Sequence, residues 1–325
     1  MASFSGTFQL TGGRGAQSGP CALSFDKDTL QLVSGGAPVL ACDLGDIDVF
    51  APGDCILDLT FFTGQQLRLQ QFGKAFDNLV HDLLEAYRAR LVKCLLLDDL
   101  EEVSRFTGTV EYRSPARSFS GPSEIRLYQS NFAVLPLDAT GFQWRLVDID
   151  AVQFDAGAYA SVLRSRDEMV KVTKLAKRTD EFRQRVEAAI RQVGERSAKV
   201  LHWFFFRIAP PAAKEPVLAW EATSRQGRAT YVFRESALVA GGGASVSPDA
   251  AADRLARGLA LVNFRREPVY LPDDSLQVQP KFRRYAIASR RLPELADLRR
   301  AFAGRAIHTS LDAWQKQMDD LMKSD

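Results

Sequence analysis

Apolar and polar residues alternate through most of the first 70 positions of the chain. The alternating runs are residues 4–10, 22–25, 29–33, 38–44, 47–50, 55–62 and 66–70, with Gly, Pro and Asp between them. Alternation places successive side chains on opposite faces of a strand, and the intervening residue types favour turns. The pattern predicts an antiparallel sheet of about seven short strands that curls into a barrel or a sandwich.

The spacing of apolar residues changes after this stretch and again about a hundred positions later. Apolar residues recur every three or four positions over residues 76–91 and 182–193, which places them on one face of a helix. Thr179 is a favoured N-cap residue. Asp180 and Glu181 would follow in the first turn, where the helix dipole stabilises acidic side chains. Strands followed by one amphipathic helix are therefore predicted twice.

The two strand-rich stretches are copies of one another. FSGTF at residues 4–8 returns as FTGTV at 106–110, and LGDID at 44–48 returns as LVDID at 146–150. The offset is 102 positions in the strands and 103 in the helices, after a single inserted residue. A fixed period with turn residues in register indicates one folding unit used twice.

The repeat stops near His202. Residues 203–208, 217–223 and 229–234 predict three strands, the last two joined as a hairpin, and residues 248–264, 293–305 and 310–323 predict helices. We therefore expect three domains, at residues 1–100, 101–200 and 201–325, the third being a smaller α+β module.

About seven strands and one C-terminal amphipathic helix, with GQQLRL at residues 64–69 before the helix, resemble the pleckstrin-homology-like (PH-like) fold. The resemblance covers residues 1–197. It implies an α+β fold class with two tandem PH-like β-barrels, each closed by a C-terminal helix, followed by the smaller module. Members of that fold family mostly bind lipid headgroups, peptides or proteins, and few are enzymes.

Composition narrows the class of protein. The 325 residues are 46% hydrophobic with a net charge of +2, which is typical of a globular protein and argues against a polycation built for DNA. No apolar run approaches the length of a transmembrane helix, and no signal peptide is apparent, so a cytoplasmic location is expected. The abundance of Ala, Arg and Gly favours a bacterial origin.

The sequence predicts no catalytic residue, metal site or cofactor. The three histidines, His81, His202 and His308, have no identifiable partners for catalysis. The repeated pairs at 46/48 and 148/150 place two carboxylates on one side of a strand, which would suit a divalent cation or acid–base catalysis. A solvated outer face beside a buried one explains both copies and is the favoured interpretation. The four cysteines are confined to the first copy and form no CxxC pair, so buried, reduced thiols are expected.

A basic segment in the last third is the main candidate contact surface. Basic residues interleaved with aromatic ones suit nucleic acid or anionic lipid, although a solvated basic face and a protein contact are alternatives. Glu294 and Asp297 would neutralise part of it by pairing along a helix. The candidate residues are Lys281, Arg283, Arg284, Tyr285, Arg290, Arg291, Arg299 and Arg300.

These observations favour a non-enzymatic binding or scaffold protein. In this interpretation the tandem domains recognise a protein or peptide partner at sheet edges or at the open mouth of a barrel. Two alternatives stay open. One is an adaptor that binds nucleic acid or anionic lipid through the basic segment, and the other is an enzyme with its site in the C-terminal module.

Overall fold

The computed structural model describes residues 2–13, 15–200, 202–208, 217–224, 227–234, 248–262 and 267–301. The chain divides into two compact units, Met1–Val193 and Gly194–Asp325. The first unit holds both copies of the repeat. The three domains expected at residues 1–100, 101–200 and 201–325 stay a prediction.

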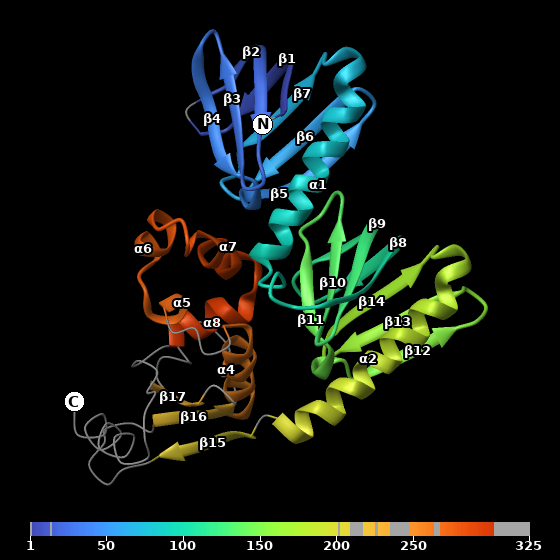
Figure 1. Cartoon of the computed structure of the whole chain (residues 1–325), viewed down its shortest axis with the longest axis vertical. Coiled ribbons are helices and arrows are strands. Elements are labelled where there is room, and N and C mark those ends of the chain that lie inside the picture. Colours follow the sequence, from blue (N-terminus) through green and yellow to red (C-terminus); the bar gives the residue numbers. More distant parts are fainter. Residues whose placement is uncertain are drawn as a thin grey trace. The chain divides into compact units, whose positions relative to one another are not determined.

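The first copy forms one seven-stranded antiparallel sheet. Its strands lie in the order β4-β3-β2-β1-β7-β6-β5, followed in the chain by a helix (Figure 1). The elements are β1 (Ala2–Thr11), β2 (Gln17–Phe25), β3 (Thr29–Ser34), β4 (Ala37–Asp43), the 3-10 turn η1 (Leu44–Asp46), β5 (Ile47–Gly53), β6 (Ile56–Phe61), β7 (Gln66–Gln70), η2 (Gly73–Ala75) and α1 (Phe76–Cys94).

The second copy has the same topology, as the sequence repeat predicts. Its order is β11-β10-β9-β8-β14-β13-β12. The elements are β8 (Glu102–Arg113), β9 (Ser118–Tyr128), β10 (Asn131–Pro136), β11 (Phe142–Arg145), η3 (Leu146–Asp148), β12 (Ala151–Asp155), β13 (Ala160–Ser165), β14 (Glu168–Thr173), η4 (Ala176–Arg178) and α2 (Thr179–Val200).

The predicted fold class is wrong in its central feature. In each sheet the two outermost strands, β4 with β5 and β11 with β12, do not pair, so neither sheet is a closed barrel with a helix as its plug. Pro38 and register shifts at Leu32/Val33 and Ile47/Val49 disfavour edge pairing in the first sheet. The first unit is a sheet-rich α+β arrangement of two open seven-stranded sheets with helices.

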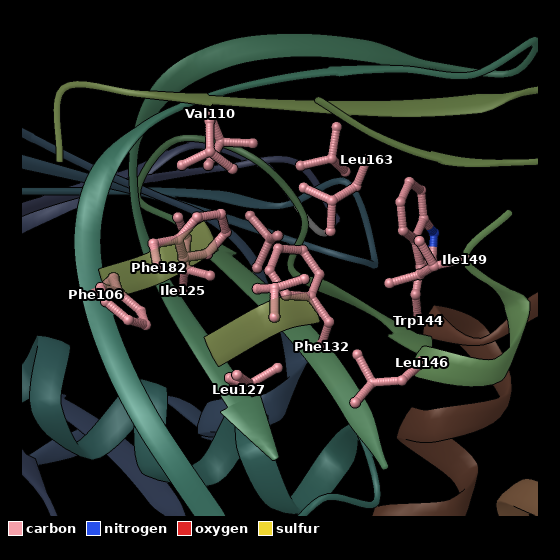
Figure 2. Close-up of a cluster of buried hydrophobic side chains, with 14 of the residues drawn as sticks. Phe106, Val110, Ile125, Leu127, Phe132, Trp144, Leu146, Ile149, Leu163 and Phe182 are labelled. Atoms are coloured by element: carbon pink, nitrogen blue, oxygen red, sulfur yellow. The ribbon is translucent and has the colours of Figure 1, made fainter. Parts of the chain in front are cut away.

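Helix α2 packs against the core of the second sheet. Its apolar residues Phe182, Val186, Ala189 and Val193 belong to one buried cluster with side chains from the strands. Phe182 lies among them (Figure 2), with its ring edge-on to that of Phe106 at 5.1 Å between centroids. The predicted apolar stripe of this helix is confirmed, but the helix packs on the sheet and does not close a barrel.

Both copies share a close approach at the centre of the sheet. A Cβ on Gly6 would lie 2.7 Å from the Phe72 ring, and one on Gly108 would lie 2.7 Å from the Thr173 carbonyl oxygen and 2.9 Å from Leu175 Cδ2. Such distances leave no room for a side chain. Glycine is therefore required where the first strand of each copy passes the end of the last.

The buried ion pair between Asp43 and Arg90 is specific to the first copy, since Arg145 and Val193 stand at the equivalent positions of the second. The Arg90 side chain on α1 donates to both carboxylate oxygens of Asp43, from Nε at 2.8 Å and Nη2 at 2.5 Å, and both residues are less than a tenth exposed. Burial alone would lower the pKa of Arg90, but its hydrogen bonds and ion pairs with Asp43 and Asp28 contribute to raising that pKa above its ordinary value. The Asp43–Arg90 ion pair therefore connects α1 to the end of β4.

The second unit contains a small sheet and several helices. The sheet has the antiparallel order β15 (His202–Ile208), β16 (Val217–Ser224), β17 (Gly227–Arg234), which confirms the three predicted strands. The described helices are α4 (Pro248–Val262), α5 (Glu267–Tyr270), α6 (Asp273–Val278), α7 (Arg283–Arg291) and α8 (Pro293–Ala301). The helix predicted at 310–323 lies outside the described residues.

The central glycine gives a first prediction. We expect Gly108→Ala to lower the free energy of unfolding by about 1–3 kcal/mol, because its methyl group meets a backbone carbonyl that cannot move aside cheaply. Gly194→Ala on α2, where nothing lies within 4 Å of the added Cβ, should instead raise it by about 0.5–1 kcal/mol. Urea unfolding measures both, and equal effects would contradict the packing argument.

The buried ion pair between Asp43 and Arg90 gives a second prediction. We expect Asp43→Ala to lower the free energy of unfolding by about 3–5 kcal/mol, because it leaves the buried Arg90 without its main counter-charge. Asp58 also pairs with an arginine, Arg68 at 2.8 Å, but both side chains are more than two-fifths exposed. Asp58→Ala should therefore change the stability little, and a similar loss in both variants would count against the assignment.

Candidate functional site

The basic residues predicted as a contact surface lie on and beside α7 and α8, which pack against one another. Lys281 and Arg290 are exposed, and Lys281 Nζ lies 4.4 Å from the centroid of the Phe282 ring. Tyr285 and Arg291 are each only 4% exposed. The segment is therefore partly surface and partly core, which the spacing of its charges did not reveal.

Several of the cations hold the helices in place. Arg299 donates to the carbonyl oxygens of Pro268 and Leu271 and to Asp273 Oδ1, and Arg300 donates to Asp297. The predicted neutralisation by Asp297 is thus confirmed.

Their neighbours on α7 make weaker local contacts. Arg284 donates to the Tyr285 hydroxyl at 3.2 Å, and Arg283 reaches the Gln277 carbonyl at 3.5 Å. Contact of this segment with nucleic acid or lipid stays a prediction, with Lys281, Arg290 and Arg300 as its exposed cations.

The paired carboxylates are used separately. Asp48 accepts a hydrogen bond from Thr140 Oγ1 at 2.6 Å, and Asp148 forms a two-bond ion pair with Arg145 at 2.8 Å. Asp150 accepts from the Arg166 backbone N–H at 2.6 Å. Within the described ranges, no group of three or more His, Cys, Asp or Glu residues is arranged to hold a metal ion.

Among the residues whose side chains are described, the remaining histidine and the cysteines do not gather into a group that could hold a metal ion. His81 is exposed on α1, the His202 side chain lies outside what the structure describes, and so does His308. Cys21 and Cys94 are buried thiols as expected, whereas Cys55 is exposed in the turn between β5 and β6. None of the described helices has the length and apolar content needed to cross a bilayer.

The structure brings out a feature that the sequence analysis named only in general terms: the unpaired sheet edges. Three of the four edges in the first unit carry protection. Pro38 lies within β4, and Pro52 and a register shift lie within β5. On β11, Gln143 Nε2 donates to the Leu95 carbonyl at the end of α1. Prolines, bulges and covering segments are the usual means of blocking an edge.

Strand β12 differs from these edges. Its five residues, AVQFD, contain no proline, lysine or arginine, and its pairing with β13 has no register shift. Among the described strands it pairs with β13 alone. Val152 packs on the core, and the Phe154 ring lies 4.9 Å below the Arg183 guanidinium of α2. Gln153 and Asp155 alternate with them and are exposed.

The equivalent edge of the first copy is occupied by the chain itself. The Phe50 backbone N–H on β5 donates to the Leu137 carbonyl oxygen at 3.2 Å, and Leu137 N–H donates to the Pro122 carbonyl at 3.3 Å. Leu137 lies in the loop between β10 and β11 of the second copy. A bent loop segment thus contacts the β5 edge through one backbone hydrogen bond. Strand β12 has no such cover in the part of the chain that is described.

Comparison with known proteins gives no family. No protein-family model and no curated protein matches the chain. Among solved structures, a crystal structure of N-terminally truncated linker-DH/PH domains of p115-RhoGEF is similar at 11% identity, with a TM-score of 0.21. The match covers 38% of this chain and 46% of that chain, so it spans under half of either. A likeness this weak supports no argument about fold or function.

The contacts of Arg299 give a third prediction. We expect Arg299→Ala to lower the free energy of unfolding of the second unit by about 1–3 kcal/mol, because two backbone carbonyls and Asp273 lose their donor. Lys281→Ala, at an exposed side chain, should be neutral within error. Thermal unfolding checks both. A neutral Arg299→Ala variant would show that its hydrogen bonds do not hold α5 and α6 in place.

Proposed function

We propose that the protein is a non-enzymatic binding protein that adds an extended segment of a partner protein to the edge of β12. The observation that carries the proposal is the contrast between edges. Three of the four sheet edges in the first unit are blocked by proline, register shifts or a covering segment, and β12 has none of these. A flat, unblocked edge is a template for pairing with another chain.

Strand addition supplies affinity through the backbone. An edge strand presents N–H and C=O groups at alternate residues, and each hydrogen bond gained contributes about 0.5–1.5 kcal/mol. Helix α2 carries Arg183 over Phe154 beside this edge, so side chains of the added segment would meet both strand and helix. The contact of the Phe50 N–H with the Leu137 carbonyl, in an edge strand that also contains Pro52 and a register shift, supports the proposal that an edge N–H of these sheets can bind a segment of chain.

Three further expectations belong to this proposal. They are a relationship of the two copies to PH-like proteins, without closed barrels, an origin in a bacterium, and a location in the cytoplasm. Composition and the repeated strand pattern motivate them. The basic segment on α7 and α8 is kept apart as a separate predicted surface, since most of its arginines contact neighbouring residues.

The fourth prediction tests the edge directly. In the first copy the N–H that points away from the sheet is that of Phe50, and Val152 holds the same place in the second. Peptides selected from a library of random linear sequences on the full chain should bind Val152→Pro about tenfold more weakly or worse, because proline has no N–H to donate. Val152→Ile, which keeps the N–H, should bind as the parent does.

Two controls accompany this test. Circular dichroism and urea unfolding establish that both variants are folded, and Gln153→Lys serves as a second edge variant because lysine on an exposed edge discourages pairing. Amide hydrogen exchange should show protection of residues 151–155 when peptide is bound. Selected peptides that bind all variants equally, or a library that yields none dependent on β12, would overturn the proposal.

A further inference from the structure

We propose that the segment accepted by β12 carries a Ser or Thr three residues after the residue whose carbonyl accepts from Val152 N–H, and that its hydroxyl donates to Asp150. This inference rests on the proposed strand addition and specifies its ligand. It is drawn from the way in which the chain fills the matching edge of the first copy.

Two contacts hold the loop at residues 137–140 against β5. The Phe50 N–H donates to the Leu137 carbonyl at 3.2 Å, and Thr140 Oγ1 donates to Asp48 Oδ1 at 2.6 Å. Moving from Leu137 to Thr140 corresponds to moving back from Phe50 to Asp48. Three residues of the loop therefore span two residues of β5, with bends at residues 137–139 between the backbone contact and the side-chain contact.

Both contact points have counterparts on the second copy. Phe50 pairs with Leu59 across its sheet, and Val152 pairs with Leu163 in the same way. Asp48 belongs to LGDID at residues 44–48, whose copy LVDID at 146–150 ends in Asp150. The N–H donor and the carboxylate acceptor that hold residues 137–140 are therefore repeated beside β12.

The acceptor at Asp150 has capacity for a ligand hydroxyl. Its Oδ2 accepts the Arg166 backbone N–H at 2.6 Å, which fixes the carboxylate in place, and the residue is exposed. A carboxylate has about four acceptor sites, so one bond to the backbone leaves others. A hydroxyl that donates to a charged carboxylate forms a stronger bond than one between neutral groups.

One feature of the internal segment is not carried over to the ligand. A Cβ on Gly141 would lie 2.8 Å from Leu91 Cδ2 of α1, so the residue after Thr140 is held to glycine by that helix. This restriction comes from α1 and not from the edge strand. The requirement we extend to β12 is the hydroxyl alone, on a segment that bends after its backbone contact as residues 137–139 do.

The test uses two labelled peptides and the full chain. One copies residues 134–143, and the other differs only by Thr140→Val, which keeps the shape of the side chain and removes the hydroxyl. Fluorescence anisotropy should show the Thr peptide binding about five- to tenfold more tightly, and a Thr140→Ser peptide should recover most of that difference. In Asp150→Asn, which keeps an acceptor for Arg166 N–H but loses the charge, the Thr-to-Val ratio should fall.

The outcomes separate this inference from the proposal beneath it. Equal binding of the Thr and Val peptides, with both lost in Val152→Pro, would overturn the hydroxyl requirement and leave strand addition standing. Binding of both peptides that is unchanged in Val152→Pro would overturn both. If library peptides bind at β12 while the Thr peptide does not, or if the selected sequences lack Ser and Thr at the stated position, the inference fails alone.

Discussion

The first unit depends on the placement of α1, which contacts both sheets. Tyr87 stacks on Phe50 of its own sheet at 5.7 Å between ring centroids, while one residue later Arg88 pairs with Glu124 of the second sheet at 3.1 Å. Glu124 is almost fully buried, and its charge is paired both with Arg126 of its own sheet, at 2.5 Å, and with Arg88 of α1. A helix expected to serve one copy is thus shared by two, which explains why residues 1–193 form one compact unit.

Local patterns in the sequence predicted much of this architecture. Alternation located the strands, helical spacing located α1 and α2, and the repeat indicated that both sheets have the same order. Closure was predicted wrongly because alternation reports which face of a strand is buried, not whether two distant edges meet. The difference between the two edges could not be predicted either. The β5 edge is covered by a contact between Phe50 and Leu137, residues far apart in the sequence.

Contacts between distant residues also limited what could be predicted from the charges of the basic segment. The sequence placed eight residues in one candidate surface, and helical spacing correctly anticipated that Asp297 neutralises part of it. It did not reveal that Arg299 is drawn to the carbonyls of Pro268 and Leu271, because those partners lie some thirty positions earlier. Charge counts identify cations, whereas only the packed structure shows which of them face solvent.

The loop that carries Leu137 also bears on how a duplicated chain changes. Two identical copies begin with two identical edges, and the contact made by Leu137 and Thr140 removes one of them from use. That copy then serves assembly, and substitutions along β5 are constrained by its partner loop. No equivalent contact constrains β12, which among the described strands pairs with β13 alone. One edge of the duplicated sheet thus connects the two copies, and the same duplication leaves its counterpart without that role.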